Sequence, residues 1–325
     1  MSSNPVNAAY DYASAGRLSD AVAILEAAGA RGNAAAFAEL ATWYLRGDLI
    51  PRDLIRARAV LRHAVSIGHV DGALLEIALT ATGSGGPANW SAALDLLRVA
   101  ARNDPVARAH LDLVEAMALN DRGYPTALGR TEQLSDDPLV ARYPAFLSEA
   151  ECKHIAHATI ALLAPSMVVD PASGRQIQNP IRTSYEALIG PTREDLVIRA
   201  INNRIAALSK TTVEQGESLT ILRYAPGQQY RLHLDTIQGT TNQRIATVLL
   251  YLNQGFEGGE TIFPSLNLSV LPKAGDAILF ANVDPAGIPD QRSRHAGLPV
   301  KSGHKWLATR WIRARPLDPW NWTPS

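Results

Sequence analysis

The sequence predicts an α+β protein, in which an N-terminal α-solenoid of helix pairs precedes a β-barrel or jelly-roll domain with supporting helices. Residues 1–120 are rich in Ala and Leu, and their apolar residues recur at i, i+3, i+4 and i+7, the spacing of amphipathic helices. From residue 219 onward, short apolar runs alternate with Gly, Pro and Asn, which is typical of short strands joined by turns. With 46% hydrophobic and 19% charged residues, the 325-residue chain has the composition of an ordinary globular protein of about two domains.

The helical part repeats with a period of 36 residues. Small or apolar side chains recur at this offset, and they belong to Ala21, Leu25 and Ala28, to Ala57, Leu61 and Ala64, and to Ala93, Leu97 and Ala100. Gly47 and Gly83 recur in the same way, each after an Ala-rich run, where a glycine ends one helix of a pair. A period of this length predicts stacked helix pairs, because one pair cannot bury its own apolar face.

Residues 38–68 resemble a Sel1-like repeat, a relative of the tetratricopeptide repeat, and the resemblance extends over roughly residues 5–118. It implies a solenoid that holds a partner or packs on a neighbouring domain. A plain helical bundle is the alternative, and neither architecture supplies catalytic groups.

Charge, cysteine content and hydropathy argue against several classes of protein. Lys+Arg and Asp+Glu both number 31, and a net charge of zero argues against general binding to nucleic acids or anionic membranes. Cys152 is the one cysteine, so neither an intramolecular disulfide nor a cysteine-based zinc site is expected. The first 20 residues lack the basic start and apolar run of a signal peptide, and no run of 18 apolar residues occurs. We therefore expect a cytoplasmic protein.

After the repeats, the composition changes. Residues 121–140, rich in Gly, Pro and Asp, are expected to form a connector between the repeats of residues 1–120 and a second domain at 141–316, with a tail at 317–325. The second domain begins with a strand leading into a helix, for which Ser148 and Glu151 have the spacing of a capping box. A further helix is expected at 194–208, and strands are expected at 219–224, 245–252, 268–271, 277–281 and 306–312.

Two histidines and an aspartate in the second domain form a candidate metal site. His233 and Asp235 stand at i and i+2, so on a strand both side chains point to the same face. Alone, the pair is equally explained by a surface histidine beside a solvated aspartate. With His295 it makes a 2-His-1-carboxylate set, which leaves three positions open on Fe(II). Zinc accepts the same ligands, so these residues leave the choice of metal open.

Lys305 is a candidate partner for an anionic co-substrate. It stands ten residues after His295, on an apolar strand, and can reach the same interior. A buried cation there would neutralise the far carboxylate of a dicarboxylic acid. A solvated lysine is the alternative, but the apolar neighbours Trp306, Leu307 and Trp311 make its strand look buried.

Four segments of the second domain resemble, in order, the catalytic domain of prolyl 4-hydroxylases. They are RYAPGQQYRLHLD, RIATVLLYLNQGFEGGETIFP, LPKAGDAILF and SRHAGLPVKSGHKWLATRWI. The resemblance covers about residues 140–316. It implies a double-stranded β-helix that binds Fe(II), 2-oxoglutarate and O2, with ascorbate as a candidate reductant.

The resemblance also implies roles for individual residues. The implied iron ligands are His233, Asp235 and His295. The residues implied to contact the distal carboxylate of 2-oxoglutarate are Lys305, Tyr224 and Thr247. The residues implied to contact substrate are Tyr230 and Trp311 in the pocket for proline, and Arg182, Ser184 and Glu217 around its rim. Plain core packing is the alternative for Tyr230 and Trp311.

The implied reaction is hydroxylation of a prolyl residue in a protein or peptide, which the repeats would recruit. The chain departs from collagen-type relatives in having only eight residues between Asp235 and Arg244, where those relatives carry a longer loop that folds over the peptide. A free amino acid or another residue type is therefore an alternative substrate. A non-catalytic interaction protein is a third hypothesis, against which the intact metal set and Lys305 argue.

Overall fold

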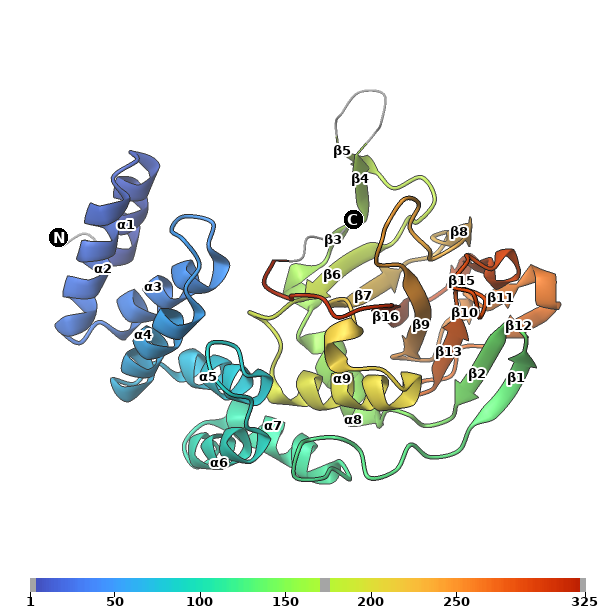
Figure 1. Ribbon diagram of the computed structural model, residues 1–325, viewed down its shortest axis with the longest axis horizontal. Coiled ribbons are helices and arrows are strands. Elements are labelled where there is room, and N and C mark those ends of the chain that lie inside the picture. The colour runs from blue at the N-terminus through green and yellow to red at the C-terminus, as the bar shows by residue number, and fades with distance from the viewer. Residues whose placement is uncertain (1–3, 170–175, 322–325) are drawn as a thin grey trace. The chain divides into compact units, whose positions relative to one another are not determined.

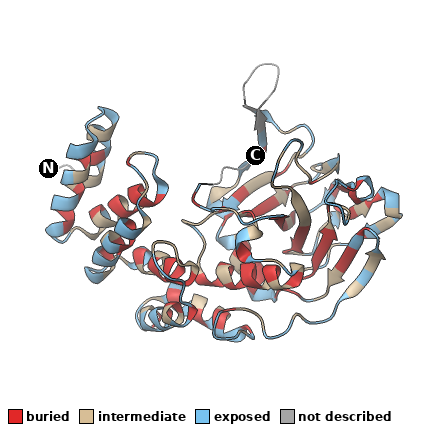
Figure 2. Cartoon of the chain, in the orientation of Figure 1, coloured by how far each residue is buried: buried red, intermediate tan, exposed pale blue. Residues whose placement is uncertain are grey.

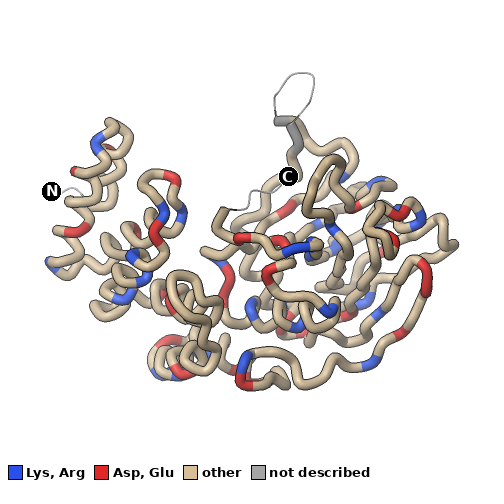
Figure 3. Tube along the Cα trace, viewed as in Figure 1, with Lys and Arg blue, Asp and Glu red and all other residues tan. Residues whose placement is uncertain are grey.

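The computed structural model describes residues 4–169 and 176–321, which form two compact units (Figure 1). The helical unit comprises Met1–Tyr124 and Thr192–Ile201, and the β unit comprises Pro125–Pro191 and Asn202–Ser325. Charges of both signs are interspersed along the helices and strands of each unit (Figure 3). None of the described helices is long and apolar enough to cross a membrane.

The helical unit is a series of helices joined by short turns. Its members are α1 (Pro5–Ser14), α2 (Leu18–Ala30), α3 (Ala34–Arg46), α4 (Leu54–Ser66), α5 (Val70–Thr82), α6 (Trp90–Ala100) and α7 (Pro105–Ala116). Each of these helices contacts the next one along the chain (Figure 1). Contacts between sequence neighbours are the arrangement that a repeat of helix pairs requires.

Both the buried positions and the helix N-caps follow the 36-residue period. The recurring Ala and Leu residues are buried, except for the half-buried Ala100 (Figure 2). The helix N-caps recur at the same offset, with Asn33 and His69 on α3 and α5, and Asp53 and Asn89 on α4 and α6. Each of these side chains accepts a hydrogen bond from a backbone N–H of the first turn.

Gly47 and Gly83 end α3 and α5 in the left-handed conformation, as the repeat predicts. A Cβ on Gly83 would lie 2.8 Å from the backbone nitrogen of Ala88, where nothing can move aside without shifting the chain. We expect Gly83→Ala to lower the free energy of unfolding by about 1–3 kcal/mol, the cost of a strained backbone residue. Urea unfolding of the full chain measures the loss.

Gly16→Ala is the matched control for this prediction. Gly16 also has a positive φ, of 75°, but a Cβ added there would have no atom within 4 Å. Only the conformational cost remains at this position, so the loss should be smaller than at Gly83. Equal losses at the two positions would show that the close approach to Ala88 contributes nothing.

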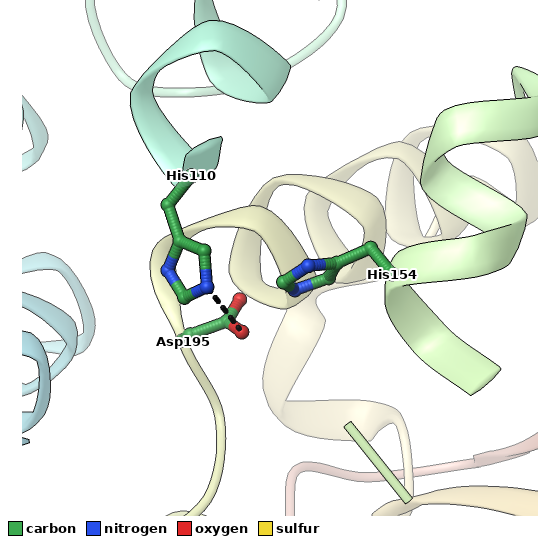
Figure 4. A group of neighbouring side chains, drawn as sticks. All are labelled: His110, His154 and Asp195. Atoms are coloured by element: carbon green, nitrogen blue, oxygen red, sulfur yellow. Dashed lines mark ion pairs between the residues drawn. The ribbon is translucent and has the colours of Figure 1, made fainter. Parts of the chain in front are cut away.

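The segment Thr192–Ile201 lies with the helical unit, although the sequence assigned it to the second domain. Asp195 lies 3.9 Å from the Nε2 atom of His110 on α7, and both side chains are largely shielded from solvent (Figure 4). Asp195 also accepts a hydrogen bond from the backbone N–H of Ile198, in the first turn of α9 (Leu196–Ser209). The helix expected at 194–208 is thus confirmed, and its first turns belong to the helical unit.

The β unit contains two antiparallel sheets. The larger has the strand order β1-β2-β13-β9-β16-β7-β6-β3, and the smaller has the order β12-β11-β14-β8. The larger sheet consists of β1 (Glu132–Asp136), β2 (Leu139–Tyr143), β3 (Ala164–Pro165), β6 (Tyr185–Ile189), β7 (Leu219–Tyr224), β9 (Arg244–Tyr251), β13 (Ala277–Ala281) and β16 (Lys305–Arg313). The smaller sheet consists of β8 (Tyr230–His233), β11 (Thr261–Phe263), β12 (Leu268–Val270) and β14 (His295–Gly297).

The β unit also contains two short two-stranded sheets, helix α8 (Glu149–His157) and the greater part of α9. The two-stranded sheets are β4 (Met167–Val169) with β5 (Gln176–Gln178), and β10 (Glu257–Gly258) with β15 (Val300–Ser302). Helix α8 begins with the expected capping box, in which Ser148 and Glu151 each accept a hydrogen bond from the other's backbone. Arg204 of α9 pairs with Glu151, and so holds the start of α8 in place.

The core of the β unit is shared by the two sheets. Its buried members are Val140, Leu222, Tyr224, Leu249, Tyr251, Phe263, Val270, Ile278, Phe280, Val300 and Leu307. They come from strands of the larger sheet, from β11 and β12 of the smaller one and, for Val300, from β15, so the buried faces of the two sheets pack together (Figure 2). A core of this kind leaves polar side chains at its open end, where a site can form.

The strands expected from the sequence are confirmed by β7, β9, β12, β13 and β16, each within one residue at either end. The expected connector at 121–140 is different, because it contains β1 and the beginning of β2. The Asp136-Asp137-Pro138 run forms the turn between β1 and β2. Its residues are typical of loops, so nothing in the sequence indicated the short strands on either side. Val140 and Ala141 of β2 are buried against β13, which extends the larger sheet.

Candidate active site

The three expected metal ligands meet at the end of the smaller sheet. His233 is the last residue of β8, Asp235 follows two residues later, and His295 is the first residue of β14. Because β8 and β14 pair antiparallel with His295 directly opposite His233, the imidazole ring centroids lie 4.2 Å apart. The Nε2 atoms of His233 and His295 lie 3.3 Å and 3.7 Å from the carboxylate oxygens of Asp235. All three donor atoms lie within 4.8 Å of one another.

Backbone carbonyls fix the tautomer of both histidines. His233 Nδ1 lies 2.7 Å from the carbonyl oxygen of Arg231, and His295 Nδ1 lies 3.1 Å from that of Ser293. A carbonyl only accepts, so each Nδ1 carries the proton and each Nε2 presents a lone pair. His233 Nε2 is buried and has no hydrogen-bond partner among the described residues. The Nε2 lone pairs of His233 and His295 face the carboxylate of Asp235, an arrangement that suits a cation bound between the three groups.

Burial and charge keep Asp235 and His295 in their ligating forms. Burial alone would raise the pKa of Asp235, but the neighbouring His295 and His233 and a hydrogen bond from Thr247 outweigh it and lower that pKa. Burial lowers the pKa of His295 to about 4, against the opposing effect of Asp235. At neutral pH Asp235 is therefore a carboxylate and His295 a neutral imidazole, and His233 adds the second imidazole of the set. This donor set fits Fe(II) as a facial triad and leaves coordination positions for other ligands.

The metal ligands line a pocket to which both sheets contribute side chains. Its other lining residues are Leu222, Tyr224, Tyr230, Leu249, Thr261, Gly297, Lys305, Leu307, Thr309 and Trp311. Four residues expected at the site are therefore brought together with the ligands, namely Tyr224, Tyr230, Lys305 and Trp311. Their strands, β7, β8 and β16, place alternate side chains on the buried face.

Lys305 is the buried cation of this pocket. It is 3% exposed, and its Nζ donates a hydrogen bond of 2.7 Å to the carbonyl oxygen of Gly259. Its Nζ also lies 5.7 Å and 5.5 Å from the ring centroids of Tyr224 and Tyr251. Burial lowers the pKa of Lys305 to about 8, while the charge of Glu260 opposes the shift. No carboxylate pairs with it among the residues that the structure describes, so it can receive an anionic ligand.

Thr247 contacts a metal ligand directly. Its hydroxyl donates a hydrogen bond of 2.6 Å to Asp235 and accepts one from Asn282, and the residue is not part of the described pocket wall. The threonines that line the pocket are Thr261 and Thr309. Thr261 is buried and lies 2.8 Å from the hydroxyl of Tyr251. The contact of Thr247 with the co-substrate stays a prediction, and Thr261 of the GGET segment is a second candidate for that contact.

Tyr230 and Trp311 present aromatic surfaces beside the ligands. The ring of Tyr230 stacks on His233 with 3.5 Å between centroids, and Arg182 lies over its other side at 5.5 Å. The guanidinium of Arg244 lies 4.0 Å from the ring centroid of Trp311. Both rings line the pocket.

Arg244 is a site residue that sequence reasoning missed. It donates two hydrogen bonds to Glu217, of 2.6 Å and 2.7 Å, and one of 3.3 Å to the carbonyl oxygen of Asp235. It opens the RIATVLLYLN segment, so the motif itself held the signal. Glu217, Arg244 and Trp311 form one contiguous group, which we call the Arg–Trp platform.

The other residues expected at the substrate rim are placed less directly. Ser184 is fully buried, and its hydroxyl lies 3.0 Å from that of Ser166 and bonds to Tyr224, so it supports the pocket from behind. Arg182 pairs with Glu186 and lies against Tyr230. Glu217 is 1% exposed and acts on the pocket through Arg244. None of the three is part of the described pocket wall.

Known proteins share this part of the chain. The family model described as the 2OG-Fe(II) oxygenase superfamily matches residues 219–313, which include the metal ligands and Lys305. Prolyl 4-hydroxylase 1 of Arabidopsis thaliana is 36% identical over 205 residues, which cover 57% of this chain and 72% of the relative. Probable prolyl 4-hydroxylase 4 of the same plant is 34% identical over 215 residues, which cover 58% of this chain and 72% of the relative.

Two solved structures are also similar to this chain. The viral collagen prolyl hydroxylase of Paramecium Bursaria Chlorella virus-1 is 30% identical, with a TM-score of 0.45, over 56% of this chain and 99% of that one. A prolyl-4-hydroxylase of Pseudomonas putida is 22% identical, with a TM-score of 0.41, over 54% of this chain and 92% of that one. The sequence matches to the plant enzymes decide the assignment, because they extend over most of each relative. The chain belongs to the prolyl 4-hydroxylase family and is a 2-oxoglutarate-dependent dioxygenase of the 2OG-Fe(II) oxygenase superfamily.

Proposed function

We propose that the chain hydroxylates a prolyl residue of a protein or peptide. One observation carries the proposal: the three candidate metal ligands line the same pocket as the buried Lys305 and the aromatic rings of Tyr230 and Trp311. In the reaction, 2-oxoglutarate, O2 and a prolyl C–H group give succinate, CO2 and a prolyl C–OH group. Iron held by His233, Asp235 and His295 supplies the oxygen activation and the oxidative decarboxylation.

Lys305 is proposed to hold the distal carboxylate of 2-oxoglutarate. Its ammonium group is buried, and its hydrogen bond to Gly259 leaves two protons for a ligand. Thr261 and Tyr224, on neighbouring walls of the pocket, are proposed to add hydrogen bonds to the same end. A dicarboxylate held at this end directs its other end towards the metal ligands, which line the same pocket.

We expect the affinity for 2-oxoglutarate to fall as the pH rises above about 8. Burial lowers the pKa of Lys305 to about 8, so the free protein loses the ammonium charge above that pH. The bound carboxylate favours the charged form, so binding above this pKa requires uptake of a proton, and affinity falls about tenfold per pH unit. Below pH 8 the lysine is charged in both states and affinity should be flat. Titrations of the Mn(II) form with 2-oxoglutarate at pH 7, 8 and 9 measure this.

Lys305→Met is the control for the pH dependence. Without the ammonium group, the weak remaining affinity should not change between pH 7 and 9. His295 titrates near pH 4, below this window, so it adds no slope. A wild-type affinity that stays constant up to pH 9 would remove Lys305 from the co-substrate site.

The Arg–Trp platform and Tyr230 are proposed to receive the prolyl segment. Aromatic faces suit the C–H groups of a pyrrolidine ring, and the indole Nε1 of Trp311 is a buried donor without a partner among the described residues. A peptide carbonyl would satisfy that donor. Glu217 holds Arg244 in position over Trp311, so the platform exists before substrate binds.

The proposal is tested by measuring succinate release and hydroxylation on a panel of substrates. The panel contains proline-containing peptides, matched peptides with alanine in place of proline, and free amino acids that include proline. We expect turnover above the substrate-free rate only with prolyl peptides. Turnover with free proline alone, or with an alanine-substituted peptide, would replace the proposal with a free amino acid or another residue type as substrate.

The helical unit is proposed to be a Sel1-like solenoid that recruits a protein target to a double-stranded β-helix. The recurrence of caps and buried residues every 36 positions supports the first part, and the two packed antiparallel sheets support the second. Recruitment raises the effective concentration of a target without altering the reacting centre. The same prolyl segment should therefore react with a lower KM in its protein than in a short peptide, with a similar kcat. Ascorbate as a reductant and a cytoplasmic location stay predictions.

A further inference from the structure

The loop that follows the metal ligands is short and closed by side-chain hydrogen bonds. It covers residues 236–243, eight in all. The side-chain amide of Gln243 accepts a hydrogen bond from the backbone N–H of Ile237 and donates one to its carbonyl oxygen, both of 2.8 Å. Asn242 binds the backbone of Arg315 in the same two-way manner, at 3.0 Å and 2.8 Å. The loop is thus fastened to itself and to the chain just after β16.

Arg313 connects this loop to the Arg–Trp platform. It is 5% exposed, its Nη1 donates a hydrogen bond of 2.6 Å to the carbonyl oxygen of Asn242, and its Nε donates to Glu217. Glu217 also receives the two hydrogen bonds from Arg244. One buried carboxylate is therefore shared by two guanidinium groups, one on β9 and one on β16.

The register of the two strands explains why this carboxylate is needed. An irregularity near the end of the β9–β16 pair places Arg313 directly opposite Arg244. Like charges directly opposite on neighbouring strands repel each other, and Glu217 between them removes that repulsion. The backbone N–H of Glu217 donates a hydrogen bond of 2.8 Å to the carbonyl oxygen of Trp311, which ties the carboxylate to the platform.

We infer that Arg313 is a positioning residue for the prolyl substrate, and that it holds in place the loop at 236–243, which follows Asp235 in the chain. It acts through Glu217 on Arg244, and through Asn242 on the loop. Without it, Glu217 keeps one cationic partner instead of two, and the loop loses its link to the platform. The inference rests on the proposed function, because the platform is where the prolyl segment is proposed to bind.

The test compares Arg313→Gln with the wild-type chain. With the prolyl peptide that gives the highest turnover in the panel, we expect the KM for peptide to rise about five- to twentyfold. The kcat at saturating peptide, the KM for 2-oxoglutarate and the substrate-free decarboxylation rate should stay within twofold, because the metal ligands and Lys305 do not contact Arg313. Hydrogen exchange followed by mass spectrometry should show faster exchange at 236–243 in the variant.

Arg310→Gln is the matched control. Arg310 is on the same strand and is equally buried, at 5% exposed, but it donates to the carbonyl oxygens of Val213 and Gly216 and not to Glu217. It should leave both the peptide KM and the exchange at 236–243 unchanged. If Arg313→Gln does not fold, Arg313→Lys decides, because lysine keeps the charge but cannot bind Glu217 and Asn242 together. Arg313→Lys should raise the peptide KM by a smaller factor than the rise expected for Arg313→Gln.

The two ways of failing are distinguishable. Unchanged peptide KM and unchanged loop exchange in the Arg313 variant would overturn the inference. So would a comparable fall in kcat, in co-substrate affinity and in peptide affinity, since that pattern marks a general disturbance of the site and not the positioning of the peptide. Hydrogen exchange needs no substrate, so a wild-type chain that turns over no prolyl peptide counts against the proposed function, while the exchange result still decides whether Arg313 holds the loop.

Discussion

Replacing Asp235 with alanine is expected to abolish iron binding and turnover. Asp235 is the only anionic group among the three clustered donors in the described pocket, and the Nε2 atoms of both histidines face it. Without it, two imidazoles remain, and they cannot hold Fe(II) against a chelator. Loss of a residue that merely orients a ligand costs about 10–100-fold in metal affinity, so loss of the carboxylate ligand should cost more than about 100-fold. Metal content per chain and succinate release measure the effect.

Thr247→Val is the matched variant for this experiment. It keeps the carboxylate and removes only the 2.6 Å hydrogen bond to it. Metal affinity should fall by a factor of about 10–100, with turnover restored at high Fe(II). If Asp235→Ala kept one metal ion per chain and normal turnover, the metal site would have to be sought elsewhere.

Lys305→Ala should weaken 2-oxoglutarate binding by about 10- to 150-fold and leave the metal content unchanged. A hydrogen bond to a charged group contributes about 1.5–3 kcal/mol, which corresponds to that range of affinity. The loss is large here because the ammonium group is buried, and water cannot replace it easily. Titration of the metal-loaded variant with 2-oxoglutarate gives the affinity directly.

Lys301→Ala is the control for the lysine experiment. Lys301 is exposed on β15, outside the described pocket wall, and its loss should not affect co-substrate binding. Lys305→Arg is unsuitable as a control, because a planar guanidinium has a different length and geometry. An unchanged affinity in Lys305→Ala would require another group to neutralise the distal carboxylate.

Much of the fold could be predicted from patterns of residues that lie close together in the sequence. The 36-residue recurrence of Ala, Leu and Gly predicted the buried positions and the helix ends, because each of these depends on neighbouring residues in the chain. The hairpin of β1 and β2 escaped prediction, since turn residues dominate that stretch and its strands are stabilised by β13, more than 130 residues away. The placement of Thr192–Ile201 with the helical unit also depends on distant partners.

At the site too, local features could be predicted from the sequence, whereas contacts between distant residues could not. His233, Asp235 and Lys305 were recognisable from spacing and from the character of their strands. For Thr247, the sequence gives its strand but not the hydrogen bond that its hydroxyl donates to Asp235. Arg244 and Arg313 make their contacts with Glu217 across strands that lie far apart in the sequence, and no local pattern reports such a contact.

The pairing of His233 with His295 has a consequence for the apoprotein. The two residues face each other on β8 and β14 although they are 62 positions apart in the chain. A metal ion bound to both acts as a reversible cross-link that closes this loop, and it does so only in the folded protein. Binding then adds about 2.7 kcal/mol of stability when free metal is 100 times its Kd. The unfolding temperature of this enzyme should therefore follow the iron supply, and chelation should loosen the smaller sheet before the larger one.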